Sequence, residues 1–269
     1  MQQAKASQQA KGWRLRRGGL PGARWISPLV LLALWELGSR TGAIPARILA
    51  APSTVAATLW SMILSGELPS NLVVSLARAG AGLAIGVTVG AGLAIAAGLS
   101  KRGELTVDPP MQMLRTLPVL ALSPLLIVWL GIGEAAKVAL IAFATAFPVY
   151  LNLYSGVRTV DVKLVEAARS FGLSNAEVIW DVILPGALPS LLVGLRYALS
   201  ISVLILVAAE QINAQAGLGY LINNARDFMR TDILVVCLLV YAALGLTADF
   251  IVRSLERRAL AWRPFLVES

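Results

Sequence analysis

The chain has 269 residues, of which 57% are hydrophobic and 14% are charged, and its net charge is +8. An ordinary soluble domain is about a quarter charged, so this composition excludes a water-soluble globular protein and indicates an integral membrane protein. The lack of histidine and the single cysteine exclude disulfide scaffolds, Cys/His metal sites and imidazole catalysis, and we expect neither a metal nor a cofactor. No phosphate-binding Gly-x4-Gly-Lys-Ser/Thr loop occurs, so we expect no enzyme here and assign any ATP hydrolysis to another chain.

A basic stretch, residues 1–24, precedes the first apolar run. It contains six Lys or Arg and no acid, which predicts a disordered cytoplasmic tail drawn to anionic lipid. No small-residue cleavage site follows the apolar run, so we expect an uncleaved first span over 25–41. Glu36 interrupts that span and is expected either at the outer interface or facing protein. Ser53 is then predicted to cap an amphipathic helix over 54–64 on the outer membrane surface.

A stripe of glycines marks the second span, which we expect over 70–99. Gly82, Gly86 and Gly90 recur every four residues, so they share one face of a helix. Small residues let helices approach closely in lipid, where packing rather than water exclusion draws them together. The stripe therefore predicts a tightly packed helix interface.

Prolines interrupt the third span, which we expect over 111–130. Pro109 and Pro110 are predicted to break the helix that precedes it, and Pro118 and Pro124 interrupt the span itself. Broken helices are tolerated in a membrane where they line a cavity. We therefore expect the third span to line a pathway through the protein.

Three further spans complete the expected set, over 135–157, 186–209 and 233–252. Small residues share one face of the fifth span and again predict close packing, namely Gly194, Ala198 and Ser202. The sequence thus predicts an all-α membrane domain over 25–260 with about six transmembrane helices. A second cytoplasmic tail is expected over 261–269.

A polar segment separates the fourth span from the fifth. Asp161 is suited to cap a first short helix, and Gly172 is suited to end it in a left-handed conformation. The spacing Ser174-x-x-Glu177 is a capping box that begins a second helix. Pro185 marks the place where that helix stops or a new one begins. The segment is therefore predicted to be two helices joined by a tight turn.

DNA-binding proteins also use a helix-turn-helix, whose second helix enters the major groove. Here the second helix carries Glu177 and Asp181 and no Lys or Arg, so the phosphate backbone would repel it. We therefore expect no nucleic-acid partner. We interpret the segment, residues 158–185, as a coupling element between membrane helices.

The distribution of basic residues predicts the topology. With the amino terminus inside, the inner segments hold fifteen Lys or Arg and the outer segments hold four. Basic residues favour the cytoplasmic side of a membrane, so both termini and the coupling element are expected in the cytoplasm.

The coupling element resembles the cytoplasmic loop of permease subunits of bacterial ABC importers. That loop has the pattern Glu-Ala-Ala-x3-Gly-x9-Ile-x-Leu-Pro, and Val182 stands here where the family usually has Ile. Six positions match the pattern: Glu166, Ala167, Ala168, Gly172, Leu184 and Pro185. The resemblance implies that these residues couple the membrane helices to an ATPase.

Other stretches resemble the aliphatic sulfonate, taurine and nitrate branch of that family. They include Trp-Glu-Leu at 35–37, Leu-Ala-Ala-Pro-Ser at 49–53, Trp-Leu-Gly-Ile-Gly-Glu at 129–134 with Lys137, and Gly-Leu-Gly-Tyr-Leu at 217–221. Leu130 replaces a Phe that is frequent in the family, which leaves the choice of substrate open. The run over 184–199 is most similar to the aliphatic sulfonate permeases.

What the resemblance implies is a type I ABC importer permease in the bacterial inner membrane. Its expected partners are a second permease copy, a cytoplasmic ATPase dimer and a periplasmic or extracellular solute-binding protein. Aliphatic sulfonates are the expected substrates, with taurine, nitrate or another small anion as alternatives.

An anion in the membrane needs a positive or hydrogen-bonding group, which makes polar residues in the spans candidates for the substrate pathway. The candidates are Arg115, beside Pro118, and Asn152, Arg78 and Arg196. Each polar side chain could instead snorkel to the interface or pair two helices. Two other classes of function remain open, a non-transporting scaffold or sensory subunit and an ion-driven secondary transporter. The inverted repeats and midplane acid pairs of the latter are not evident.

Overall fold

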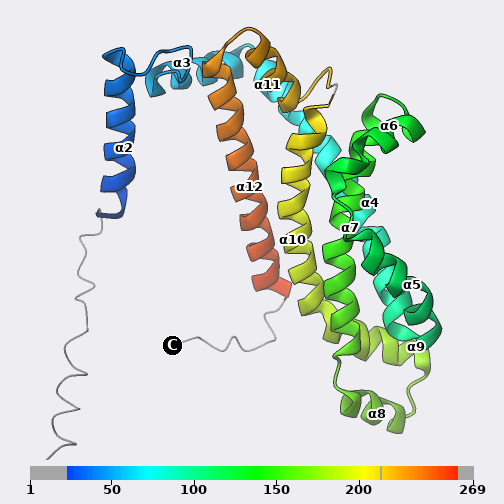
Figure 1. Ribbon diagram of the computed structural model, residues 1–269. Coiled ribbons are helices and arrows are strands. Elements are labelled where there is room, and N and C mark those ends of the chain that lie inside the picture. Colours follow the sequence, from blue (N-terminus) through cyan, green and yellow to red (C-terminus); the bar gives the residue numbers. More distant parts are fainter. Residues whose placement is uncertain (1–22, 213, 260–269) are drawn as a thin grey trace, which may run out of the picture.

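The computed structural model describes residues 23–212 and 214–259, and every regular element in those ranges is a helix (Figure 1). Of the predicted tails, over 1–24 and 261–269, residues 1–22 and 261–269 lie outside the described residues, and residues 23 and 24 begin α2. The helices run in the order α2 (Ala23–Arg40), α3 (Pro52–Leu64), α4 (Glu67–Leu99), α5 (Lys101–Leu114), η1 (Val119–Leu122), α6 (Ser123–Leu130), α7 (Glu134–Arg158), α8 (Val162–Ser170), α9 (Asn175–Glu177), η2 (Val178–Ile183), α10 (Leu184–Glu210), α11 (Leu218–Asp227) and α12 (Thr231–Ala259).

Four helices in the described part of the chain are long and apolar enough to cross a membrane. They are α4, α7, the continuous helix over Asn175–Glu210, and α12. A fifth span is present if α5 and the segment Val119–Leu130, which meet at an angle of 92°, count as one. The sequence led us to expect about six spans. The difference is α2, because its 18 residues include the charged Glu36 and Arg40.

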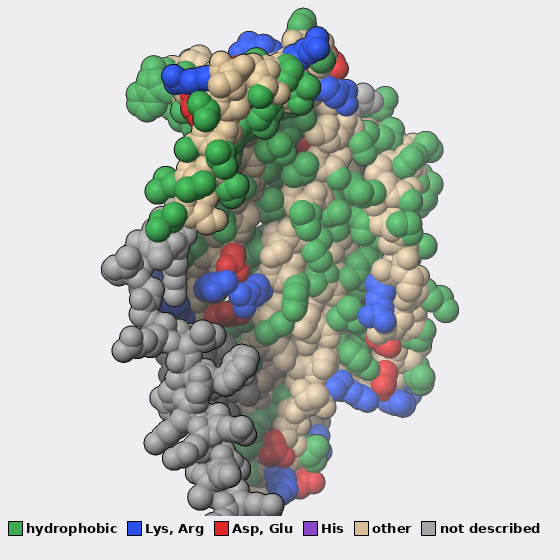
Figure 2. Space-filling model, turned by 60° about the vertical axis from the view of Figure 1, so that its left-hand side comes forward, with side chains coloured by type: hydrophobic (Ala, Val, Ile, Leu, Met, Phe, Trp, Pro, Cys, Tyr) green, Lys and Arg blue, Asp and Glu red, His purple; other side chains and the backbone are tan. Residues whose placement is uncertain are grey.

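Exposed apolar side chains cover most of the bundle surface. Figure 2 shows hydrophobic side chains over much of one face, with charged groups at its upper end and in its lower half. Large apolar side chains on the long helices are more than half exposed, including Val73 on α4 and Leu246 and Phe250 on α12. Contact with lipid explains this exposure on spanning helices, because soluble proteins rarely expose so large an apolar area to water.

Helix α7 lies at the centre of the bundle, between α4 and α10 (Figure 1). The glycine stripe of α4 faces it: a Cβ on Gly82 would lie 2.6 Å from the Ile141 side chain, and one on Gly86 would collide with Thr145. On the other side, a Cβ on Gly194 of α10 would lie 2.9 Å from the Pro148 carbonyl oxygen. The predicted close packing of both small-residue stripes is therefore confirmed.

The prediction that Pro109 and Pro110 break a helix is wrong, because α5 continues through both. The break comes later, at residues 115–118. Two contacts hold the last turn of α5 in place: Met111 is buried in an apolar cluster with α7, and the Gln112 amide donates to Asp108 at 3.1 Å. Tertiary packing here outweighs the unfavourable helix propensity of proline.

The predicted cap at Ser53 is also wrong, since α3 begins one residue earlier, at Pro52. Ser53 donates instead to the Glu36 carboxylate, through its hydroxyl at 2.8 Å and its amide at 3.0 Å. The first turn of α3 is therefore capped by an acidic side chain from α2. Glu36 thus contacts protein, and its placement relative to the membrane interface stays a prediction.

We predict that Gly86→Leu destabilises the protein by about 3 kcal/mol or more, because the new side chain must displace Thr145 and the α7 backbone. Gly92→Leu is the matched control, since nothing lies within 4 Å of a Cβ at that position on the same helix. Thermal unfolding of the purified protein in detergent measures both. Equal unfolding temperatures for the two variants would contradict the close packing of α4 on α7.

Candidate functional site

The predicted turn between two helices is present after α7. Asp161 caps the start of α8 by accepting a hydrogen bond from the Lys163 amide at 2.9 Å. Gly172 follows the end of α8 in a left-handed conformation, with φ +86°. Ser174 and Glu177 form the reciprocal capping box, in which the Ser174 amide donates to the Glu177 carboxylate at 2.7 Å. All three local predictions are confirmed. The result is a compact unit, α8 followed by α9 and η2, at the end of the molecule opposite α3 and α11 (Figure 1).

Large apolar side chains are exposed on this unit. Phe171 is 86% exposed and Trp180 71%, although the surrounding surface is polar. Val162 and Leu164 on α8 are also more than half exposed, whereas Ala168 and Val178 are buried inside the unit. An apolar surface rimmed by polar groups is typical of a protein docking site.

A continuous helix leads from this unit into a span. It runs from Asn175 to Glu210 without a break, and its segment Val178–Ile183 is a π-helix. Pro185, in the first turn of α10, follows the π segment directly. A π turn re-routes backbone hydrogen bonds, and π turns and prolines are both places where a helix bends. The unit is therefore joined to the fifth span by continuous helix, with no loop between them.

The candidate pathway residues are dispersed in the structure. Arg115 and Pro118 are both exposed and lie at the bend between α5 and η1. The Asn152 amide donates to the Pro148 carbonyl oxygen at 2.8 Å inside α7. Arg196 of α10 lies 3.4 Å from the Asp249 carboxylate of α12. Of these residues, only Arg115 and Pro118 lie close together.

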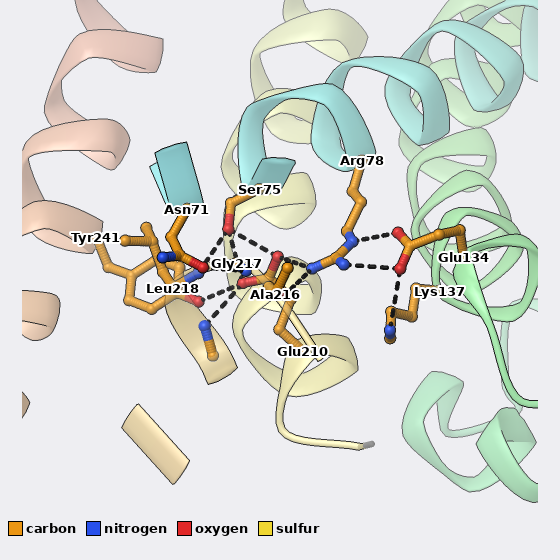
Figure 3. Close-up of polar contacts among 11 residues, drawn as sticks. Asn71, Ser75, Arg78, Glu134, Lys137, Glu210, Ala216, Gly217, Leu218 and Tyr241 are labelled. Carbon is orange, nitrogen blue, oxygen red and sulfur yellow. Dashed lines mark hydrogen bonds and ion pairs between the residues drawn. The ribbon is translucent and has the colours of Figure 1, made fainter. Parts of the chain in front are cut away.

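Arg78, the fifth candidate, belongs to a buried polar cluster with residues of the α10–α11 connection (Figure 3). Its side chain is only 4% exposed and pairs with Glu210, which is fully buried, at 2.6 Å. Arg78 also binds both carboxylate oxygens of Glu134 and donates to the Ala216 carbonyl oxygen at 2.7 Å. Lys137, at 3.3 Å from Glu134, completes a set of two cations and two anions.

Glu210 accepts hydrogen bonds from four residues on three other elements. It accepts from Ser75 of α4 at 2.7 Å, from the Gly219 amide of α11 at 3.0 Å and from the Tyr241 hydroxyl of α12 at 2.9 Å, besides Arg78. A buried ion pair is tolerable only where further hydrogen bonds satisfy the remaining lone pairs. The cluster therefore joins α4, α7, α10, α11 and α12.

Sequence reasoning missed Glu210, because its partner Ser75 is 135 residues away in the chain. A signal was present in the Gly-Leu-Gly motif at 217–219. Gly217 has φ +102°, and a Cβ there would lie 2.5 Å from both Arg78 and Glu210. Gly219 has no room for a Cβ against Glu210. These glycines let the backbone close over the ion pair.

Comparison with known proteins gives consistent matches over most of the chain. The family model for the binding-protein-dependent transport system inner membrane component matches residues 82–260. The chain is 46% identical to the putative aliphatic sulfonates transport permease protein SsuC of Escherichia coli, over 94% of this chain and 95% of that protein. It is 36% identical to the taurine transport system permease protein TauC of the same organism, over 87% and 86% of the two chains.

A solved structure matches as well. A chain from the crystal structure of an amino acid ABC transporter with histidines superposes with a TM-score of 0.60 at 21% identity. The match covers 74% of this chain and 98% of that chain.

We predict that Glu210→Ala lowers the free energy of unfolding by about 3–5 kcal/mol, because it leaves Arg78 buried with one carboxylate fewer. The matched control is Asp227→Ala, which removes an exposed carboxylate paired only with its exposed neighbour Arg226, and should cost less than about 0.5 kcal/mol. Thermal unfolding of the purified variants compares the two. A stable Glu210→Ala protein would show that the cluster does not hold the helix ends together.

Proposed function

The chain belongs to the family of binding-protein-dependent transport system inner membrane components, and we propose that it is the permease subunit of an ATP-driven importer of aliphatic sulfonates. It is a multi-pass membrane protein with the fold of type I ABC importer permeases. The family and the fold favour an importer permease over a stand-alone scaffold or an ion-driven carrier.

Two relatives from one organism support the choice of substrate. Identity is 46% to the permease named for aliphatic sulfonates and 36% to the permease named for taurine. Taurine is itself a small sulfonate with an added amine, so it is the second candidate. Both substrates present the same anionic head group to the pathway.

We base the proposal of a separate ATPase subunit on the exposed apolar surface of the coupling element. Phe171 and Trp180 project from the polar end of the molecule, where a groove in a cytoplasmic ATPase subunit could bury them. Six residues of this segment, Glu166, Ala167, Ala168, Gly172, Leu184 and Pro185, fit the loop pattern of ABC permeases. An ATPase dimer, a second permease copy and a solute-binding protein complete the proposed complex.

Orientation follows from charge. The coupling element and the arginines at the end of α12 lie toward the same end of the molecule, and α3 and α11 lie at the other (Figure 1). Basic residues favour the cytoplasmic side. We therefore place both termini and the coupling element in the cytoplasm, and α3 and α11 on the side of the solute-binding protein.

Arg115 is our first candidate for contact with the substrate anion. Its side chain is exposed at the bend of the broken span beside Pro118, whereas Arg78 and Arg196 already pair with carboxylates. Asn152 donates to its own helix but could turn toward a solute. An unpaired cation at a break in a span is available to an anion in transit.

The test of this function is uptake of a radiolabelled alkanesulfonate by vesicles that contain the chain with its ATPase and binding protein. We expect ATP-dependent uptake, and we expect Arg115→Ala to raise the apparent KM or lower the rate by about tenfold. Arg102→Ala, at an exposed position near the start of α5, is the control and should transport normally. Vesicles of the unmodified complex that import no sulfonate would overturn the assignment.

We predict that Gly172→Asp uncouples ATP hydrolysis from uptake, because a side chain is strained at φ +86° and deforms the turn that presents Phe171. Uptake should fall by about tenfold or more while the protein stays in the membrane. Gly42→Asp is the matched control, since Gly42 has φ +78° in the connection between α2 and α3, far from the coupling element. Uptake and ATP hydrolysis are measured in the same vesicles, and normal uptake with Gly172→Asp would contradict the coupling role.

A further inference from the structure

Helices α5 and α7 are joined near the coupling element by a row of polar side chains. On α7, Tyr150, Tyr154 and Arg158 are spaced by four residues and so share one face. On α5, Asp108 and Glu104 are also four residues apart, but they follow one another in the reverse order along the chain. We call this set the tyrosine ladder.

Three contacts make up the ladder. The Tyr150 hydroxyl donates to Asp108 at 2.8 Å, and the Tyr154 hydroxyl donates to Glu104 at 3.3 Å. Arg158 donates to the same Glu104 carboxylate at 3.2 Å. Hydrogen bonds to an ionised carboxylate are stronger than those between neutral groups, so the ladder fixes the register of the two helices.

Packing makes the ladder stiff. Tyr150 is fully buried, and its ring stacks on that of Tyr154 with centroids 5.7 Å apart and planes 5° from parallel. Met111 of α5 lies in the same apolar cluster as Tyr150 and Leu153. The inner part of α7 therefore cannot move far without α5.

The ends of the ladder reach two parts of the molecule that the proposed function uses. Arg158 is the last residue of α7, three residues before Asp161 caps α8. On the other side, α5 ends at Leu114, six residues after Asp108, and the chain then turns by 92° into the segment that leads to α6. The ladder is thus the side-chain connection between the coupling element and the bend of the broken span.

We propose that the tyrosine ladder transmits displacement of the docked coupling element to the bend at residues 115–118, so that Tyr150 and Tyr154 act as positioning residues for transport. This inference rests on the proposed function, because it requires an ATPase that moves the coupling element. A rigid row of contacts has two outcomes when one end is displaced: the other end follows, or the contacts break. The buried Tyr150 ring and its stacking on Tyr154 favour the first.

The test uses the double variant Tyr150→Phe/Tyr154→Phe, which keeps both rings and removes both hydroxyl groups. The matched control is Tyr197→Phe, whose hydroxyl on α10 makes no hydrogen bond with the described part of the chain. Each is combined with Thr116→Cys, which places a thiol at the exposed bend; the native Cys237 is buried. Vesicles of the complete complex are assayed for sulfonate uptake, ATP hydrolysis and the rate of thiol labelling with and without a non-hydrolysable ATP analogue.

We expect the analogue to change the labelling rate at position 116 in the parent and in the Tyr197→Phe control. In the double variant, labelling should no longer respond, and uptake per ATP hydrolysed should fall by about tenfold while ATP hydrolysis continues. A double variant that keeps both the labelling response and the uptake ratio would overturn the inference, as would a parent that imports sulfonate without any labelling response. If the double variant is lost from the membrane, Tyr154→Phe alone is judged by the same two measurements. Failure of the parent to import sulfonate would instead overturn the proposed function.

Discussion

The pairing of Arg78 with Glu210 is the interaction on which the arrangement of the outer helix ends depends. Two opposite charges are removed from water there, and each finds further partners on other helices. The cost of leaving either one unmatched in an apolar bundle is several kcal/mol, so the surrounding helices can adopt few other positions. The closed loop at Gly217 is possible only because no side chain competes for the space above the pair.

Helix α7 connects this outer cluster to the opposite end of the molecule. Its first turn supplies Glu134 and Lys137 to the cluster, and its last turn supplies Arg158 to the tyrosine ladder. Between the two, small residues on α4 and α10 let it pack closely against both helices. One buried helix is thus fixed by charges at both ends and by backbone proximity in the middle, which suits a part that must transmit force without bending.

Interactions between residues close together in the sequence could be predicted, whereas those between distant residues could not. The caps at Asp161, Gly172 and Ser174 involve residues two or three positions apart, and they were predictable from local pattern alone. The glycine stripe was predictable because it depends on helical periodicity. The partners of Glu210 and Tyr150 were not, since they lie on helices far away in the chain. Pro109 was misjudged because contacts of α5 with α7 outweigh its local preference.

The π-helical stretch at Val178–Ile183 determines how the coupling element is rotated about the helix axis relative to the membrane span. A π turn holds more residues than an α turn, so everything that follows is rotated about the helix axis relative to a regular helix. Removing a single residue from the stretch would turn Trp180 and its neighbours by roughly 100° against the lipid-buried face of α10. The stretch therefore sets the azimuth at which a force applied to the coupling element enters the bundle.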